Sequence, residues 1–145
     1  MSGGVARAGE LEIWTQTTPP RLLRTVPVED SGNFTLAWEH SVEHFQWRET
    51  FQITSAGRLR LLRSSTKGYG AGTPDRQQEG AAFSVENGWL VSAPARLELG
   101  ELPIRLSRLA PHWIESGSVR VSLLDIAGEQ AIILRPRRGV MADHR

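Results

Sequence analysis

Apolar and polar residues alternate with a period of two along much of the chain. The clearest stretch is residues 34–53, where the apolar positions are even-numbered up to Val42 and odd-numbered from Phe45 onward. Alternation of this kind is typical of strands with one buried face. Further runs have strand-like composition: Leu11–Thr15, Arg21–Val26, Arg58–Ser65, Ala82–Glu86, Trp89–Ser92, Arg96–Leu99, Ile104–Leu109, Ser118–Leu124 and Gln130–Leu134.

Turn-forming residues separate these runs at short intervals, and no stretch of ten or more residues has a helical pattern. Asn87-Gly88 is the strongest hairpin signal, because both central residues of a type I′ turn need positive φ. The pattern predicts an all-β fold, a single-domain antiparallel β-sandwich or barrel of about nine to eleven strands over residues 11–134. Residues 1–10 are expected to form a flexible N-terminus, and residues 135–145 a basic, disordered C-terminal tail.

The change of parity between Val42 and Phe45 predicts a hairpin with Glu43 and His44 at its tip. The predicted cross-strand neighbours are His40 with Trp47, Trp38 with Glu49, Leu36 with Phe51 and Phe34 with Ile53. His40 and Glu49 interrupt the apolar face, and as diagonal neighbours their Cα atoms are expected about 7–8 Å apart. Two interpretations follow. The pair is either a structural hydrogen bond that fixes the register, or part of a ligand, metal or proton-transfer site that includes Glu43.

A glycine-rich segment, residues 67–75, has glycine at alternate positions: Gly68, Gly70 and Gly72, with Tyr69 between the first two. Glycine admits backbone conformations that other residues avoid, and exposed N–H groups can hold an anion. The segment lacks a terminal Gly-Lys-Ser/Thr and is not followed by a helical pattern, so it does not match a phosphate-binding loop. It is either a functional loop over one end of the β-structure or a bare connection.

Five tryptophans are a high number for 145 residues. Alternation places Trp38 and Trp47 in the core. Trp89 follows the predicted hairpin tip, and Trp113 falls in a predicted connection where it would be exposed. An exposed tryptophan can serve as a platform for a sugar or a partner, although large aromatic residues are more often anchors of a core or an interface.

The composition is that of an ordinary globular domain, with 39% hydrophobic residues, 17 Lys+Arg against 16 Asp+Glu, and a net charge of +1. Because the chain has no Cys, disulfides, zinc fingers, iron–sulfur clusters and thiol catalysis are excluded, and a metal site would use only N and O ligands. The balanced charge argues against nucleic acid as a partner. The chain has no window apolar enough for a transmembrane segment and no apolar signal-peptide core at its N-terminus, which by itself predicts a cytoplasmic location.

Four strings of the sequence together resemble a known family. They are Phe34-Thr35-Leu36-Ala37-Trp38-Glu39-His40-Ser41-Val42-Glu43, Trp47-Arg48-Glu49-Thr50-Phe51, Gly68-Tyr69-Gly70-Ala71-Gly72-Thr73-Pro74 and Asn87-Gly88-Trp89. In this order, within residues 11–134, they look like the small domain of unknown function numbered 1850. The resemblance implies a prokaryotic origin and an extracytoplasmic or membrane-associated location. It also implies a genetic association with TRAP-type transporters of the TAXI class, which take up small organic acids using a sodium gradient.

The leading hypothesis is therefore a non-enzymatic β-domain that serves as an accessory or ligand-binding component of a TAXI-type TRAP transporter. Its partner would be the permease or the solute-binding protein, its ligand a small organic acid, and no cofactor is expected. The candidate ligand-binding residues are His40, Ser41, Glu43, Trp47, Glu49, Gly68, Tyr69, Gly70 and Gly72. An alternative is a metal-dependent or acid/base enzyme that uses His40, Glu43 and Glu49. A third is a carbohydrate-binding module that uses Trp113 or Trp89.

Overall fold

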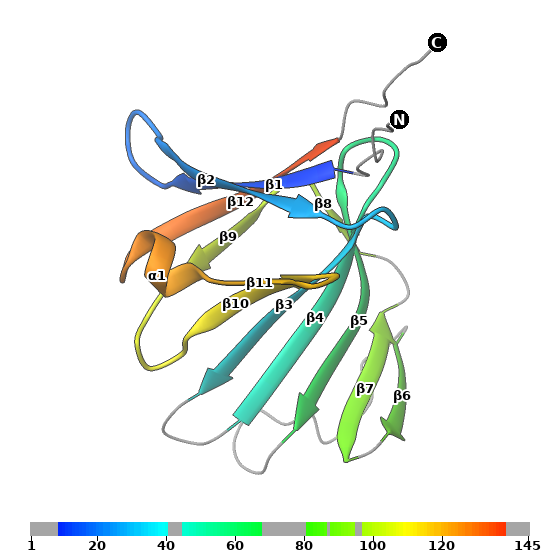
Figure 1. The fold of residues 1–145 in the computed structure, drawn as a ribbon. Helices are drawn as coiled ribbons and strands as arrows, with labels where there is room; N and C mark the ends of the chain where they lie inside the picture. Colours follow the sequence, from blue (N-terminus) through cyan, green and yellow to red (C-terminus); the bar gives the residue numbers. More distant parts are fainter. Residues whose placement is uncertain (1–8, 41–44, 68–80, 87, 95–96, 139–145) are drawn as a thin grey trace.

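Two antiparallel β-sheets pack against each other in this protein. Its structure, a computed structural model, describes residues 9–40, 45–67, 81–86, 88–94 and 97–138. Figure 1 shows the smaller sheet lying across one end of the larger one. Neighbouring strands in the described part of the chain pair in the antiparallel sense in both sheets.

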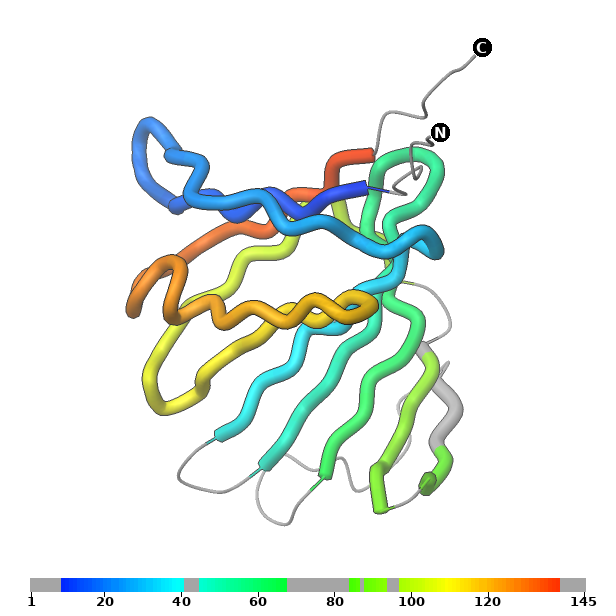
Figure 2. The backbone as a smooth tube through the Cα atoms, in the orientation of Figure 1, coloured from blue at the N-terminus to red at the C-terminus, as the bar shows by residue number. Residues whose placement is uncertain are grey.

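The small sheet has four strands and joins the two ends of the described chain. Its order is β2-β1-β12-β9, with β1 at Gly9–Thr15, β2 at Leu22–Val28, β9 at Leu102–Arg105 and β12 at Ala131–Arg138. Gly9 pairs with Arg138, so β1 begins where β12 ends, as the blue and red ends of the thick tube show in Figure 2. Gly9 has no room for a side chain, because a Cβ there would lie 2.6 Å from the carbonyl oxygen of Arg137.

The large sheet has eight strands in the described residues, in the order β11-β10-β3-β4-β5-β7-β6, and the short β8 pairs with β5. The strands are β3 (Asn33–His40), β4 (Phe45–Ile53), β5 (Leu59–Lys67), β6 (Ala81–Glu86), β7 (Trp89–Pro94), β8 (Glu98–Leu99), β10 (His112–Ser116) and β11 (Val119–Ser122). One short helix, α1 (Leu123–Ala127), follows β11 in this part of the chain. Among the described residues, no helix has the length and apolar character that a membrane span needs.

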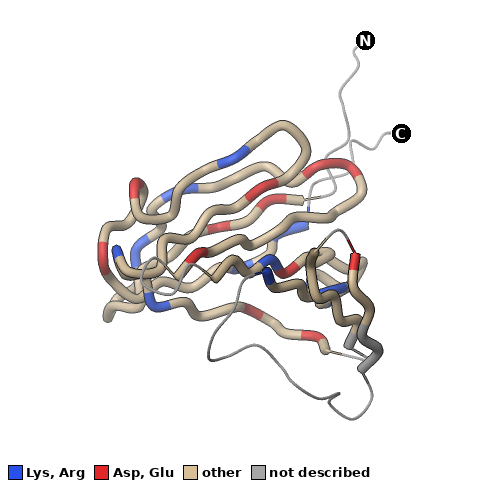
Figure 3. Tube along the Cα trace, turned by 90° about the horizontal axis from the view of Figure 1, so that it is seen from below, with Lys and Arg blue, Asp and Glu red and all other residues tan. Residues whose placement is uncertain are grey.

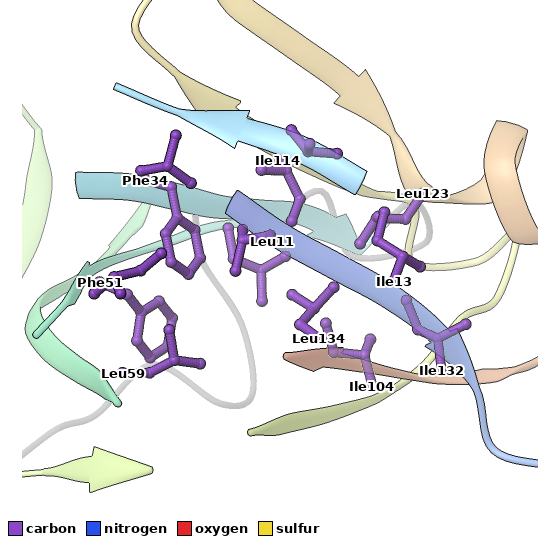
Figure 4. Close-up of a cluster of buried hydrophobic side chains, with 14 of the residues drawn as sticks. Leu11, Ile13, Phe34, Phe51, Leu59, Ile104, Ile114, Leu123, Ile132 and Leu134 are labelled. Atoms are coloured by element: carbon purple, nitrogen blue, oxygen red, sulfur yellow. The ribbon is translucent and has the colours of Figure 1, made fainter. Parts of the chain in front are cut away.

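The hydrophobic core lies between the two sheets (Figure 4). Phe34, Phe51 and Ile114 of the large sheet are buried against Leu11 and Leu134 of the small sheet. We call this face of the large sheet the inner face and the opposite one the outer face. Because side chains of a strand alternate between faces, the residues between these core positions point to the outer face.

The ends of β3, β4 and β5 that include His40, Phe45 and Lys67 reach beyond the small sheet (Figures 1 and 2). We call this the far end of the large sheet.

A buried serine connects the two sheets at the opposite end, the near end. The Ser116 hydroxyl donates to the carbonyl oxygen of Asn33 at 2.8 Å and accepts from the N–H of Glu29 at 2.9 Å, so it joins β10, β3 and the end of β2. Basic and acidic residues are interspersed along the strands (Figure 3).

The all-β prediction is confirmed, in the form of a two-sheet sandwich with twelve strands in the described residues. The strand that the pattern missed is β10, which the sequence predicts as a connection with an exposed Trp113. Two of its inward-facing residues, His112 and Ser116, are polar, and both are buried and hydrogen-bonded. They interrupt the alternation of apolar and polar residues from which a strand is predicted. Trp113 is therefore a strand residue and only partly exposed.

The predicted strand Ser118–Leu124 is wrong beyond Ser122. At that position the Ser122 hydroxyl accepts a hydrogen bond from the backbone N–H of Asp125 at 3.2 Å, which is the geometry of a helix N-cap. Leu123 is the first helical residue and is fully buried in the core. The apolar residues of this segment thus cover the core from a helical turn rather than from a strand.

The predicted register of the β3–β4 hairpin is wrong by two residues. Trp38 pairs with Trp47, Leu36 with Glu49 and His40 with Phe45, so residues 41–44 connect the strands. The predicted faces hold, because a shift of two residues preserves parity. However, His40 and Glu49 are not diagonal neighbours. Leu36, the partner of Glu49, lies four residues from His40, about 13 Å along the strand at roughly 3.3 Å per residue.

The hairpin predicted at residues 87 and 88 is confirmed. Glu86 pairs with Trp89, which leaves a two-residue connection, and Gly88 has a φ of 83°. Asn87 lies outside the described residues. At the ends of the domain, β1 begins at Gly9 and β12 continues to Arg138, so both strands extend past the boundaries expected at residues 11 and 134. The rest of the predicted tail, residues 139–145, also lies outside the described residues.

Candidate functional site

A polar pocket of about 190 Å³ opens on the outer face of the large sheet. Ala37 forms its floor, with the larger Trp113 on β10 and Arg48 on β4 as its cross-strand partners. A small residue between two long ones leaves a hollow in the sheet surface. The residues that line it are Ala37, Trp38, Glu39, Gln46, Arg48, Trp89, Trp113, Glu115 and Arg120.

Two arginines in this pocket share one carboxylate. Arg48 Nη2 donates to Glu115 Oε1 at 2.6 Å, and Arg120 Nε donates to Glu115 Oε2 at 2.9 Å. Arg120 is the cross-strand partner of Glu115 on β11, whereas Arg48 reaches it from β4, across β3. Each guanidinium carries five N–H donors, and these bonds engage one on each side chain. The two side chains are 42% and 57% exposed, so remaining donors can reach a ligand.

The arginines keep Glu115 ionised. Burial alone would raise the pKa of this carboxyl, but the hydrogen bonds and charges of Arg120 and Arg48 outweigh burial, and the pKa lies below its ordinary value of 4.5. At neutral pH two cations thus surround one anion. The cluster Arg48–Glu115–Arg120, which we call the arginine cluster, has a net charge of about +1.

Tryptophans from two distant strands line the same pocket. The guanidinium carbon of Arg120 lies 4.7 Å from the ring centroid of Trp113 on β10, and Lys67 Nζ lies 5.7 Å from that of Trp89 on β7. Cation–π contacts of this kind help to hold the indoles in place. The two residues that the sequence offers separately as sugar platforms therefore belong to one site.

A row of stacked rings occupies the inner face near the far end of the sheet. The Trp38 ring lies between His112, with centroids 5.3 Å apart, and Trp47, with centroids 5.7 Å apart. His112 Nδ1 lies 2.7 Å from the carbonyl oxygen of Ala110, so Nδ1 carries the hydrogen. Burial lowers the pKa of His112 despite this bond, which keeps the ring neutral at physiological pH.

Glu49 lies on the same inner face, half-buried, beside Trp47 on β4. Its cross-strand partners are Leu36 and Ser64, neither of which carries a positive charge. Glu49 forms no hydrogen bond or ion pair with the described residues. Burial therefore raises its pKa above the ordinary value of 4.5.

Glu49→Gln is expected to stabilise the protein at neutral pH and to leave its stability unchanged in acid. Below the unfolded-state pKa both states of the parent hold the proton, so charge burial costs nothing. As pH rises through the window between that pKa and the raised folded-state value, the parent loses stability and the variant does not. The expected gain at about pH 7 is on the order of 1 kcal/mol in the free energy of unfolding. Urea titrations at about pH 4 and pH 7 measure it, and an equal difference at both would contradict this role for Glu49.

The structure places the sequence-predicted residues as follows. His40, Trp47 and Glu49 share the inner face, and Trp47 and Glu49 are neighbours on it, whereas His40 is separated from Glu49 by the Trp38–Trp47 pair. No three His, Asp or Glu side chains of the described residues are grouped closely enough to hold a metal ion. The remaining predicted ligand-binding residues lie outside the described residues: Ser41, Glu43, Gly68, Tyr69, Gly70 and Gly72.

Sequence reasoning missed the four charged residues that line the pocket: Glu39, Arg48, Glu115 and Arg120. The sequence did indicate which face Arg48 occupies, because alternation puts it on the face opposite Trp47 and Glu49. Glu115 and Arg120 gave no such indication, since β10 was not recognised and the two residues meet only through the β10–β11 hairpin.

These features define a two-sheet β-domain with a charged, tryptophan-lined pocket of small-molecule size on its larger sheet. A family model described as "Domain of unknown function (DUF1850)" matches residues 34–123, more than half of the chain, and the chain belongs to this family. The match runs from β3 to the first residue of α1 and includes every residue that lines the pocket. No curated protein and no solved structure matches the chain.

Proposed function

We propose that this protein is a non-enzymatic, ligand-binding accessory component of a TAXI-type TRAP transporter, and that it binds a small organic acid in the outer-face pocket. The transporter association rests on the family resemblance of the sequence. The ligand class rests on one observation, the arginine cluster formed by Arg48, Glu115 and Arg120.

The arginine cluster suits a carboxylate for reasons of geometry and charge. Guanidinium groups form paired, charge-assisted hydrogen bonds with carboxylates. Glu115 holds the guanidinium groups of Arg48 and Arg120 on either side of its own carboxylate. One bound carboxylate would neutralise the net charge of about +1 in this cluster. The volume of about 190 Å³ is below the roughly 300–1,000 Å³ of sites for drug-sized ligands, which favours a small acid.

The chemistry of the pocket supports binding rather than catalysis. The described lining residues include no serine, threonine or histidine that could act as nucleophile or proton carrier. The lining holds two carboxylates, Glu39 and Glu115, and Glu115 is a poor general base because both arginines lower the pKa of its carboxyl. The walls are indole rings from Trp113 and Trp89, which can pack against the hydrocarbon part of an acid.

Two measurements test the proposal. The tagged chain, expressed with a TAXI-type permease and its solute-binding protein, is expected to co-purify with one of them, and deletion of the chain is expected to slow uptake of the transported acid. Calorimetry with the purified chain is expected to show binding of small organic acids. Unchanged uptake together with no co-purification would contradict the accessory role.

A further inference from the structure

We propose that the pocket selects acids with a single carboxylate and rejects dicarboxylates of similar size, and that Glu39 is the residue that determines this selectivity. The inference rests on the proposed function, because it takes an organic acid as the occupant of the pocket. It adds a limit on the number of carboxylates in the ligand, which neither the arginine cluster nor the family resemblance implies.

Opposite charges lie toward opposite ends of the pocket. On β3, Thr35 is the cross-strand partner of Glu115, Ala37 is the floor, and Glu39 lies two residues further along the same face. Thr35 and Glu39 are four residues apart, about 13 Å along a strand at roughly 3.3 Å per residue. Glu115 and Arg120 therefore lie toward one end of the pocket and Glu39 toward the other. Arg48 is level with Ala37 between them, and its guanidinium is turned toward Glu115.

This arrangement fixes how an acid would lie. A carboxylate bonded to Arg48 and Arg120 leaves the rest of the molecule over Ala37, between the tryptophans and toward Gln46 and Glu39. An apolar or aromatic body suits that path. A second carboxylate at the far end would approach the Glu39 carboxylate, and like charges brought together at a binding site repel each other and weaken binding.

The register places two cations of the outer face, Lys67 and Arg48, close to Glu39, and each has another contact. Lys67 is across the strand from Gln46, but its ammonium lies over the Trp89 ring, and Lys67 does not line the pocket. Arg48, a diagonal neighbour of Glu39 across the β3–β4 pair, donates to Glu115 at 2.6 Å. Glu39 forms no ion pair with a described residue, so no direct partner in the described part of the chain neutralises its carboxylate.

The test compares acids that differ by one carboxylate, in the parent and in Glu39→Gln. The probes are benzoate with terephthalate and hexanoate with adipate, measured by calorimetry near neutral pH. The parent is expected to bind each monocarboxylate at least about tenfold more tightly than its partner, a difference of about 1.4 kcal/mol. Glu39→Gln is expected to bring the ratio close to one by strengthening the dicarboxylate. Because the effect is electrostatic, the ratio in the parent should fall with added salt.

A control variant and the contrary outcomes separate this inference from the proposed function. Glu101→Gln removes a carboxylate that lies outside the pocket and pairs with Arg135, and the parental ratio should persist. Equal binding of mono- and dicarboxylates by the parent, or an unchanged ratio in Glu39→Gln, would overturn the selectivity and leave the acid site standing. Failure of all four acids to bind would instead overturn the proposed function.

Discussion

Phe51→Ala is expected to lower the free energy of unfolding by about 3–5 kcal/mol. Phe51 is 2% exposed and its ring stacks on Phe34 with centroids 5.5 Å apart. Both rings belong to the hydrophobic cluster that lies between the two sheets. Truncation of Phe51 therefore leaves a cavity, because the hydrogen-bonded sheets cannot move together to fill it. For a domain whose total stability is roughly 5–15 kcal/mol, this is a large share. Urea unfolding followed by tryptophan fluorescence measures it.

Val85→Ala provides the matched control for a loss of side-chain volume. Val85 lies on the edge strand β6 and is 75% exposed, so its truncation is expected to change stability by no more than about 0.5 kcal/mol. Phe51→Leu should fall between the two, because it keeps most of the apolar volume. If Phe51→Ala cost as little as Val85→Ala, the two sheets would not share the core described above.

Arg48→Ala is expected to weaken binding of a small organic acid by about tenfold to a hundredfold. Hydrogen bonds to charged groups contribute roughly 1.5–3 kcal/mol, and Arg48 supplies one side of the carboxylate site. The variant also releases Glu115 from one of its two partners, which leaves the cluster without net positive charge. Calorimetry with benzoate on the parent and the variant gives the ratio.

Arg63→Ala is the control for Arg48→Ala. Both arginines lie on the outer face of the large sheet, with side chains 42% and 49% exposed and a glutamate partner, but Arg63 does not line the pocket. Its removal is expected to leave affinity unchanged. Equal losses in the two variants would mean that general surface charge, and not the arginine cluster, attracts the acid.

Local alternation predicted which face of the sheet each residue of the β3–β4 hairpin occupies. Phe34 and Phe51 are core residues as expected, and Trp38 and Trp47 share their face. This information is local, because successive side chains of a strand point to opposite sides whatever the strand pairs with. The register was not determined in the same way, since shifts by two residues preserve the apolar face.

The candidate site could not be predicted from a local sequence pattern. Arg48 is separated from Glu115 and Arg120 by more than 60 residues, and they meet because β10 and β11 pair on the far side of β3. Nothing in the spacing of these residues distinguishes them from solvent-exposed charges elsewhere on the sheet. The inner-face pair His40 and Glu49 was easier to notice, yet the observed register separates it.

The all-β class, the inner and outer faces of the β3–β4 hairpin and the Gly88 turn could be predicted from the sequence, because each depends on neighbouring residues and on the period of a strand. That Trp113 and Trp89 line one pocket with Arg48, Glu115 and Arg120 depends instead on the tertiary structure. The order of strands in a sheet depends on how the whole chain buries its apolar surface, and that order brings together residues that no local period relates.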